Sequence, residues 1–104
     1  MDDLLHVTTI DAWTAARHDG QYRQPQGGFI HLCTRAQLPF VLGRHFAGQR
    51  DLVVLRIDPT GLDVRWEDSE PGMLPFPHLY GPLPVTAVRE VEPPQISWAP
   101  HRGP

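Results

Sequence analysis

Three of the six histidines lie in segments that are otherwise typical of a protein interior. His6, His31 and His78 have apolar, aromatic or small polar neighbours rather than exposed charges. Histidine is the side chain whose protonation is most easily adjusted near neutral pH, so the three residues could serve acid–base chemistry. Alternatively, each could be a core residue whose ring nitrogens are satisfied by the backbone. Both interpretations stay open at this level.

A carboxylate and a phenol could complete such a site. Arg65 and Glu67 flank Trp66 in a short strand-like segment, so the alternation of side chains places both charges on one face. Glu67 could then be a carboxylate held at the mouth of a pocket. Alternatively, the two charges could form an exposed pair worth at most about 1 kcal/mol.

His78 and Tyr80 lie in Phe76–Pro84, where prolines at 77, 82 and 84 predict a rigid loop. Loops on a firm scaffold often carry functional side chains. We therefore expect this segment to form a wall that faces a ligand.

Metal and thiol chemistry have less support. No HxH or HxxxH pair lies on a plausible element, so no metal is expected, although zinc bound by three distant histidines stays open. Cys33 is the only cysteine and is expected to be a buried structural thiol; a nucleophile beside His31 is the alternative. The absence of lysine excludes Schiff-base chemistry and a lysine-containing phosphate loop.

The elements that position these residues must be short, because twelve prolines and nine glycines interrupt the chain. Hydrophobic alternation predicts strands over Leu4–Thr8, Phe29–Cys33, Asp51–Ile57, Val64–Glu67 and Val85–Val91. Helical spacing predicts helices over Ala12–His18 and Arg35–His45, capped by Thr9 or Asp11 and by Thr34, respectively. The segments Gln21–Gly28 and Asp68–Pro77 are predicted to be loops.

The 104 residues suffice for one domain, predicted over residues 1–92 and followed by a proline-rich tail over residues 93–104. A net charge of −3 disfavours nucleic-acid binding, and no apolar run is long enough to span a bilayer. We therefore expect a cytoplasmic protein that acts on a small molecule as a monomer or homodimer.

Five segments, taken in order, resemble the DUF952 family. They are His6–Thr9 (HVTT), Gly28–Leu38 (GFIHLCTRAQL), Leu52–Pro59, Val64–Glu67 (VRWE) and Phe76–Pro84 (FPHLYGPLP). The resemblance spans about residues 4–91, and its second and fifth motifs are the most specific to the family. The sequence departs from the family at Cys33, where serine is usual.

The resemblance implies an α+β fold with a small, split and bent, mostly antiparallel sheet and two short helices. This core is similar to those of ADP-ribosyltransferases and RNA 2′-phosphotransferases, which hold NAD or an ADP-ribosylated intermediate between two half-sheets. The expected function is therefore a small enzyme acting on NAD, ADP-ribose or another nucleotide-like molecule. The alternatives are a non-catalytic binding module and a biosynthetic or detoxifying enzyme that uses the same cleft for an unrelated small molecule.

The resemblance also suggests roles for single residues. His31, Glu67 and His78 are the expected catalytic residues, and His6, Thr8, Thr34, Arg65 and Tyr80 are the expected ligand-binding residues. Glu67 would stabilise an oxocarbenium-like centre or accept a proton, and His6 would contact ribose hydroxyls or phosphate. No cofactor is expected, and NAD would enter as a substrate.

Overall fold

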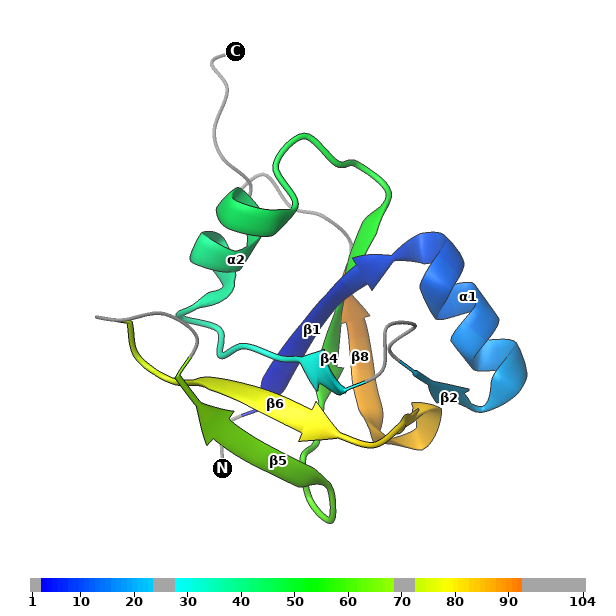
Figure 1. The fold of residues 1–104 in the computed structure, drawn as a ribbon. Helices are drawn as coiled ribbons and strands as arrows, with labels where there is room; N and C mark the ends of the chain where they lie inside the picture. Colours follow the sequence, from blue (N-terminus) through cyan, green and yellow to red (C-terminus); the bar gives the residue numbers. More distant parts are fainter. Residues whose placement is uncertain (1–2, 24–27, 69–72, 93–104) are drawn as a thin grey trace.

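The computed structural model describes residues 3–23, 28–68 and 73–92 (Figure 1). In chain order, the elements of these ranges are β1 (Leu4–Thr9), α1 (Ile10–Asp19), β2 (Gln21–Tyr22), β3 (Phe29–His31), α2 (Leu38–His45), β4 (Leu52–Ile57), β5 (Asp63–Glu67), β6 (Phe76–Tyr80), β7 (Leu83–Pro84), a 3₁₀ turn (Val85–Ala87) and β8 (Val88–Glu92). The predicted tail over residues 93–104 lies outside the described residues.

The strands form two three-stranded sheets, in the orders β1-β4-β8 and β3-β6-β5, and a small β2-β7 ladder. All of these pairs are antiparallel. Figure 1 shows the first sheet running steeply between the two helices, with β5 and β6 crossing below it. The fold is therefore α+β with two helices and antiparallel sheets, which confirms the sequence prediction at this level.

In the described residues, the two larger sheets meet at a single bridge. The Leu5 N–H donates to the Cys33 carbonyl, and the Cys33 N–H donates to the Leu5 carbonyl, each at 2.8 Å. No other pair joins β1 to β3 or its flanking residues in the described ranges, so most of one edge of β1 is left without a neighbouring strand.

Apolar side chains cover both faces of the sheet that β1 and β4 share. One face packs against α2 and the other against α1 and the second sheet. The cluster on the α2 side contains Leu5, Val7, Cys33, Leu38, Leu42, Leu52 and Val54, and the opposite cluster contains Leu4, Ala16, Tyr22, Ile30, Leu32, Val53, Leu55, Ile57, Leu79 and Leu83. Burial of this kind contributes roughly 25 cal/mol per Å² of apolar surface, so β1 and β4 are firmly held.

The first helix begins as the sequence predicts. The Thr9 hydroxyl accepts the Ala12 N–H at 3.0 Å, and Gly20 ends the helix with a φ of 89°. Thr9 is therefore the N-cap, a position at which a side-chain oxygen satisfies one of the free N–H groups of the first turn.

The second helix begins at Leu38 rather than at Arg35, so its predicted start was wrong. The Thr34 N–H donates to the Gln37 side chain at 3.0 Å, while the Gln37 N–H donates to the Thr34 hydroxyl at 3.1 Å. This reciprocal pair closes a separate turn, because Ser and Thr side chains compete with helical hydrogen bonds. Thr34 caps that turn and not the helix.

The segment Phe76–Pro84 is not a loop, and the prediction was wrong there. Its first half is β6, the central strand of the second sheet. Pro77 is tolerated because it lies beyond the last β3–β6 pair, His31 with His78, while its carbonyl still accepts the Leu32 N–H at 3.0 Å. A proline is compatible with a strand where its missing N–H has no ladder partner.

Two smaller predictions also need correction. The predicted loop Gln21–Gly28 contains β2, which pairs with β7. The predicted strand Val85–Val91 begins with the 3₁₀ turn and becomes β8 only at Val88. Finally, no helix in the described part of the chain is long and apolar enough to cross a membrane.

Candidate functional site

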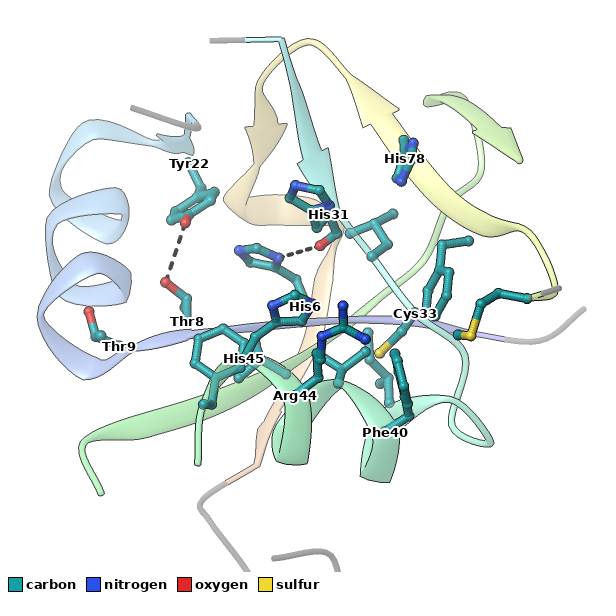
Figure 2. Close-up of a pocket in the computed structure, with 17 residues that line it drawn as sticks. His6, Thr8, Thr9, Tyr22, His31, Cys33, Phe40, Arg44, His45 and His78 are labelled. Atoms are coloured by element: carbon teal, nitrogen blue, oxygen red, sulfur yellow. Dashed lines mark hydrogen bonds between the residues drawn. The ribbon is translucent and has the colours of Figure 1, made fainter. Parts of the chain in front are cut away.

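A cavity of about 530 Å³ lies beside β1 (Figure 2). Its lining residues come from β1, β2, the segment that begins at β3, α2 and the residue after it, and β6 with the segment before it. They are Leu5, His6, Val7, Thr8, Thr9, Tyr22, His31, Leu32, Cys33, Phe40, Val41, Arg44, His45, Phe46, Met73, Phe76 and His78. Figure 2 shows His6 and His31 close together above β1, with Arg44 projecting toward them from α2.

The position of the cavity follows from the split between the sheets. Side chains from both faces of β1 line it, which places the cavity along the edge of the strand. In an antiparallel strand, alternate residues direct their N–H and C=O to opposite edges. Since Leu5 uses both groups to bond Cys33, Val7 directs its own N–H and C=O to the same edge, where it lines the cavity.

His6 is a buried, neutral imidazole. Its Nδ1–H donates to the His31 carbonyl at 2.6 Å. Burial outweighs this hydrogen bond and lowers the pKa of His6 to about 4, with a further lowering from the nearby His31 ring. The other ring nitrogen, Nε2, therefore carries a lone pair at neutral pH, and it is buried with no hydrogen-bond partner in the described residues.

His31 is exposed and lies between His6 and His78. Its ring stands edge-on to that of His78, with centroids 5.4 Å apart and planes at 83°. Partial burial lowers the pKa of His31, and the neighbouring imidazoles of His78 and His45 lower it further. The ring is therefore also neutral at neutral pH.

His78 has a different environment, because a carboxylate accepts the hydrogen bond from its Nδ1–H. Its Nδ1–H donates to Glu67 Oε1 at 2.7 Å, and the Tyr80 hydroxyl donates to the same oxygen at 2.7 Å. These two hydrogen bonds, the one from His78 first, lower the pKa of Glu67. His78 is only 5% exposed, and its Nε2 is buried without a partner in the part of the chain that is described.

The structure brings four of the eight predicted site residues to the cavity: His6, Thr8, His31 and His78. The Thr8 hydroxyl donates to the Tyr22 hydroxyl at 3.3 Å. Glu67 and Tyr80 do not line the cavity; Glu67 accepts a hydrogen bond from His78, and Tyr80 donates to Glu67.

Arg65 and Thr34 do not line the cavity. The Arg65 guanidinium covers the Tyr80 ring at 4.3 Å and pairs with the Asp63 carboxylate at 3.0 Å. Thr34 belongs to the turn that precedes α2. We find no ligand-facing position for either residue.

Sequence reasoning did not identify the contributions of β2 and of α2 to the lining. Tyr22 lay in a predicted loop, and its position depends on the pairing of β2 with β7, which no local pattern indicates. Phe40, Arg44 and His45 share an exposed face of α2, and only the packing of the helix shows that this face borders the cavity. The spacing of Phe40 and Arg44, one turn apart, was the available signal.

Cys33 lines the cavity but is not poised for nucleophilic chemistry. It is 2% exposed, and burial raises the pKa of its thiol to about 12. The reactive form of cysteine is the thiolate, which is negligible here at neutral pH. No group of three or more metal-ligating side chains occurs within residues 3–23, 28–68 and 73–92.

Comparison with known proteins gives one family match and one similar protein. Residues 7–91 match the family model described as "Protein of unknown function (DUF952)". The X-ray crystal structure of protein CC0527 from Caulobacter crescentus has 31% sequence identity and a TM-score of 0.79, covering 91% of this chain and 95% of that one. Its solution NMR structure has 34% sequence identity and a TM-score of 0.75, covering 88% of this chain and 83% of that one. No curated protein matches the chain.

Proposed function

The chain belongs to the DUF952 family, and we propose that it has the ADP-ribosyltransferase-like core that the sequence resemblance implies, binds a nucleotide-like molecule in the cavity beside β1 and acts on it. NAD, ADP-ribose and their derivatives are the candidate ligands, and the reaction class is cleavage or transfer at a ribosyl bond. The observation that carries the proposal is the Nε2 of His6, an acceptor on a neutral ring that has no partner in the described residues and lies on β1 beside the cavity.

An unpartnered buried acceptor is costly, because it has lost its hydrogen bond to water. The cost is typically about 1–3 kcal/mol. A ligand hydroxyl that donates to His6 Nε2 would recover this energy, and the vicinal hydroxyls of ribose are donors of this kind. The native structure therefore favours a ligand that carries hydroxyl or N–H donors.

The edge of β1 offers a second point of recognition. Val7 directs a backbone donor and a backbone acceptor to the side that borders the cavity. A carboxamide, such as that of nicotinamide, carries the complementary acceptor and donor. A volume of about 530 Å³ also lies within the range of about 300–1,000 Å³ that is common for small-molecule sites.

The histidines suit a ligand that becomes positively charged. Breaking an N-glycosidic bond places positive charge on the sugar, and neutral imidazole rings add no positive charge to that of Arg44, which also lines the cavity. The lowered pKa values of His6 and His31 keep both rings neutral at neutral pH. Protonation of these two rings would add two positive charges beside the cationic nicotinamide ring of NAD.

Titration calorimetry with NAD and ADP-ribose tests the proposal. We expect binding by the wild type and an affinity at least about tenfold weaker in His6→Ala, the equivalent of one lost hydrogen bond. His18→Ala, on the exposed surface of α1, is the matched control and should bind normally. If the folded wild type gives no binding heat with either nucleotide, the proposal fails.

A non-catalytic binding module is the second candidate. It is favoured by the lining itself, because no carboxylate occurs among the described residues that border the cavity. A carboxylate in contact with the sugar is the usual means of stabilising an oxocarbenium-like centre. Release of nicotinamide from NAD, measured by chromatography, separates the two candidates: a binding module retains the affinity and shows no release.

A further inference from the structure

We propose that Glu67 and His78 form a carboxylate–imidazole pair in which His78 Nε2 accepts the proton of an O–H nucleophile bound in the cavity, with Glu67 as the positioning residue. The nucleophile is a water molecule or the hydroxyl of an acceptor. This inference rests on the proposed function and assigns the acid–base step of the same site.

The first argument is that the imidazole is fixed in place. Glu67 Oε1 holds Nδ1 at 2.7 Å, and the Phe29 ring stacks on the imidazole with centroids 4.0 Å apart and planes at 15°. His31 meets the same ring edge-on. A catalytic group that is held on a strand by such contacts does not need to be ordered during the reaction.

The second argument is the difference between the two ring nitrogens. Nδ1 has a charged partner, whereas Nε2 is buried and has none among the described residues. A histidine with a purely structural role usually has both nitrogens satisfied. Because His78 also lines the cavity, Nε2 is the nitrogen left for a ligand.

The third argument is the support behind Glu67. Tyr80 donates to the same carboxylate oxygen at 2.7 Å, and the Arg65 guanidinium lies over the Tyr80 ring at 4.3 Å. The hydrogen bonds from His78 and Tyr80 keep Glu67 ionised, as its lowered pKa indicates. When His78 takes a proton, the new positive charge therefore meets a negative charge at hydrogen-bond distance.

His6 provides the contrast that assigns the roles. It lacks a carboxylate partner in the described structure, and burial keeps it neutral. Where two titratable groups in one site have environments that differ in this way, the environment identifies the acid–base residue. His6 is therefore the acceptor that holds the ligand, and His78 is the group that takes up a proton.

The proposed step balances for an N-ribosyl pyridinium such as NAD. The nucleophile's oxygen forms a bond to the anomeric carbon, and the bond from that carbon to the pyridinium nitrogen breaks. The bonding electron pair leaves with nicotinamide, which departs neutral. The proton of the O–H group passes to His78 Nε2 and is released to solvent after the product leaves.

The tautomer of His78, read from ¹⁵N–¹H correlation spectra of the full chain, tests the pair without any ligand. We expect the Nδ1-protonated form in the wild type and in Glu67→Gln, whose side-chain oxygen can still accept, and its loss in Glu67→Ala. On addition of ADP-ribose, the His78 Nε2 signal should shift. A ring protonated at Nε2 in the wild type overturns the pair.

Steady-state release of nicotinamide from NAD tests the proton transfer. His78→Gln should lower kcat by about 100-fold or more, in the range of general base catalysis, with affinity for ADP-ribose within about threefold of the wild type. Glu67→Gln, which removes the charge and keeps the hydrogen bonds, should lower kcat about tenfold or more at unchanged KM. His18→Gln is the matched control and should match the wild type.

The outcomes distinguish this inference from the proposed function. The role of His78 as proton acceptor is refuted if His78→Gln retains kcat within about threefold, or if NAD binds without any turnover. In either case the proposal of nucleotide binding stands. If no nucleotide binds, the proposed function fails. The tautomer of His78 then tests the His78–Glu67 pair by itself. The Nδ1-protonated form supports the pair, and the Nε2-protonated form refutes it.

Discussion

His6 and His78 are both buried histidines at one cavity, and they differ in the group that accepts the hydrogen bond from Nδ1–H. For His6 the acceptor is the neutral carbonyl of His31, and for His78 it is the carboxylate of Glu67. A carbonyl fixes the orientation of the ring but supplies no net charge to balance an imidazolium. A carboxylate does both. The same residue type is therefore suited to accept a hydrogen bond at one position and a proton at the other.

The difference originates in the two sheets. His6 lies on β1, in a sheet that is covered on both faces. His78 lies on β6, whose sheet turns one face to the core through Ile30 and Leu79 and gathers polar side chains on the other. His78 therefore has a carboxylate partner on that second face, whereas His6 bonds to a backbone carbonyl.

The largest expected effect comes from truncating a core side chain of β1. The Leu5 side chain is 1% exposed and packs in the cluster on the α2 side, so Leu5→Ala should cost about 2–5 kcal/mol of the free energy of unfolding. Chemical denaturation measures this loss. Leu74→Ala is the matched control, because Leu74 is 78% exposed and its truncation should change stability by less than about 0.5 kcal/mol. Equal effects of the two substitutions would contradict the account of the core.

Acid should reveal the buried His6. Its pKa is about 4 in the folded chain and about 6.5 in the unfolded chain. As the pH falls through this window, the unfolded state binds a proton at this ring that the native state does not, so stability is lost. The loss tends toward about 3 kcal/mol below the folded pKa.

His6→Leu removes this titration and isolates the effect. Between pH 7 and pH 4.5, the wild type should lose about 2–3 kcal/mol more of its unfolding free energy than His6→Leu, as measured by urea denaturation. Parallel curves for the two proteins would show that His6 is not buried in a neutral form.

A smaller effect is expected from the second hydrogen bond to Glu67. Tyr80→Phe removes the donor at 2.7 Å and leaves the His78–Glu67 contact in place. We expect nicotinamide release to fall by about three- to tenfold, corresponding to about 1 kcal/mol, with unchanged KM for NAD. A change in KM alone would instead make Tyr80 a ligand contact.

The smallest effect is expected at Cys33. Because burial keeps it a neutral thiol, Cys33→Ser should change nicotinamide release by less than about threefold. The native thiol should also resist a disulfide reagent until the chain is unfolded with urea. Rapid labelling of the native chain, or loss of activity in Cys33→Ser, would contradict the structural role.

Local patterns predicted the parts of the site that depend on one strand at a time. Alternation placed His6 and Thr8 on one face of the first strand, and Arg65 and Glu67 on one face of another. The structure confirms the second pairing, since Glu67 and Arg65 both contact Tyr80. The Thr9 cap was also readable, because it depends only on residues three apart.

The rest depends on pairing between distant segments, which the sequence does not encode locally. Pro77 and its neighbours indicated a loop, and only the end of β3 beside Pro77 makes a strand acceptable there. The cavity lies where β1 and the segment after β3 share, among the residues described, one isolated bridge. The proximity of Glu67 to His78 likewise depends on the register of β5 and β6.

The most direct test of the central claim is the backbone amide spectrum of the ¹⁵N-labelled chain during titration with ADP-ribose and NAD. The account predicts that the largest shifts occur along the open edge of β1, at Val7 and its neighbours, and at His31, and that His6→Ala weakens them. Shifts confined to the outer surface of α1, or no shifts at millimolar nucleotide, would contradict it.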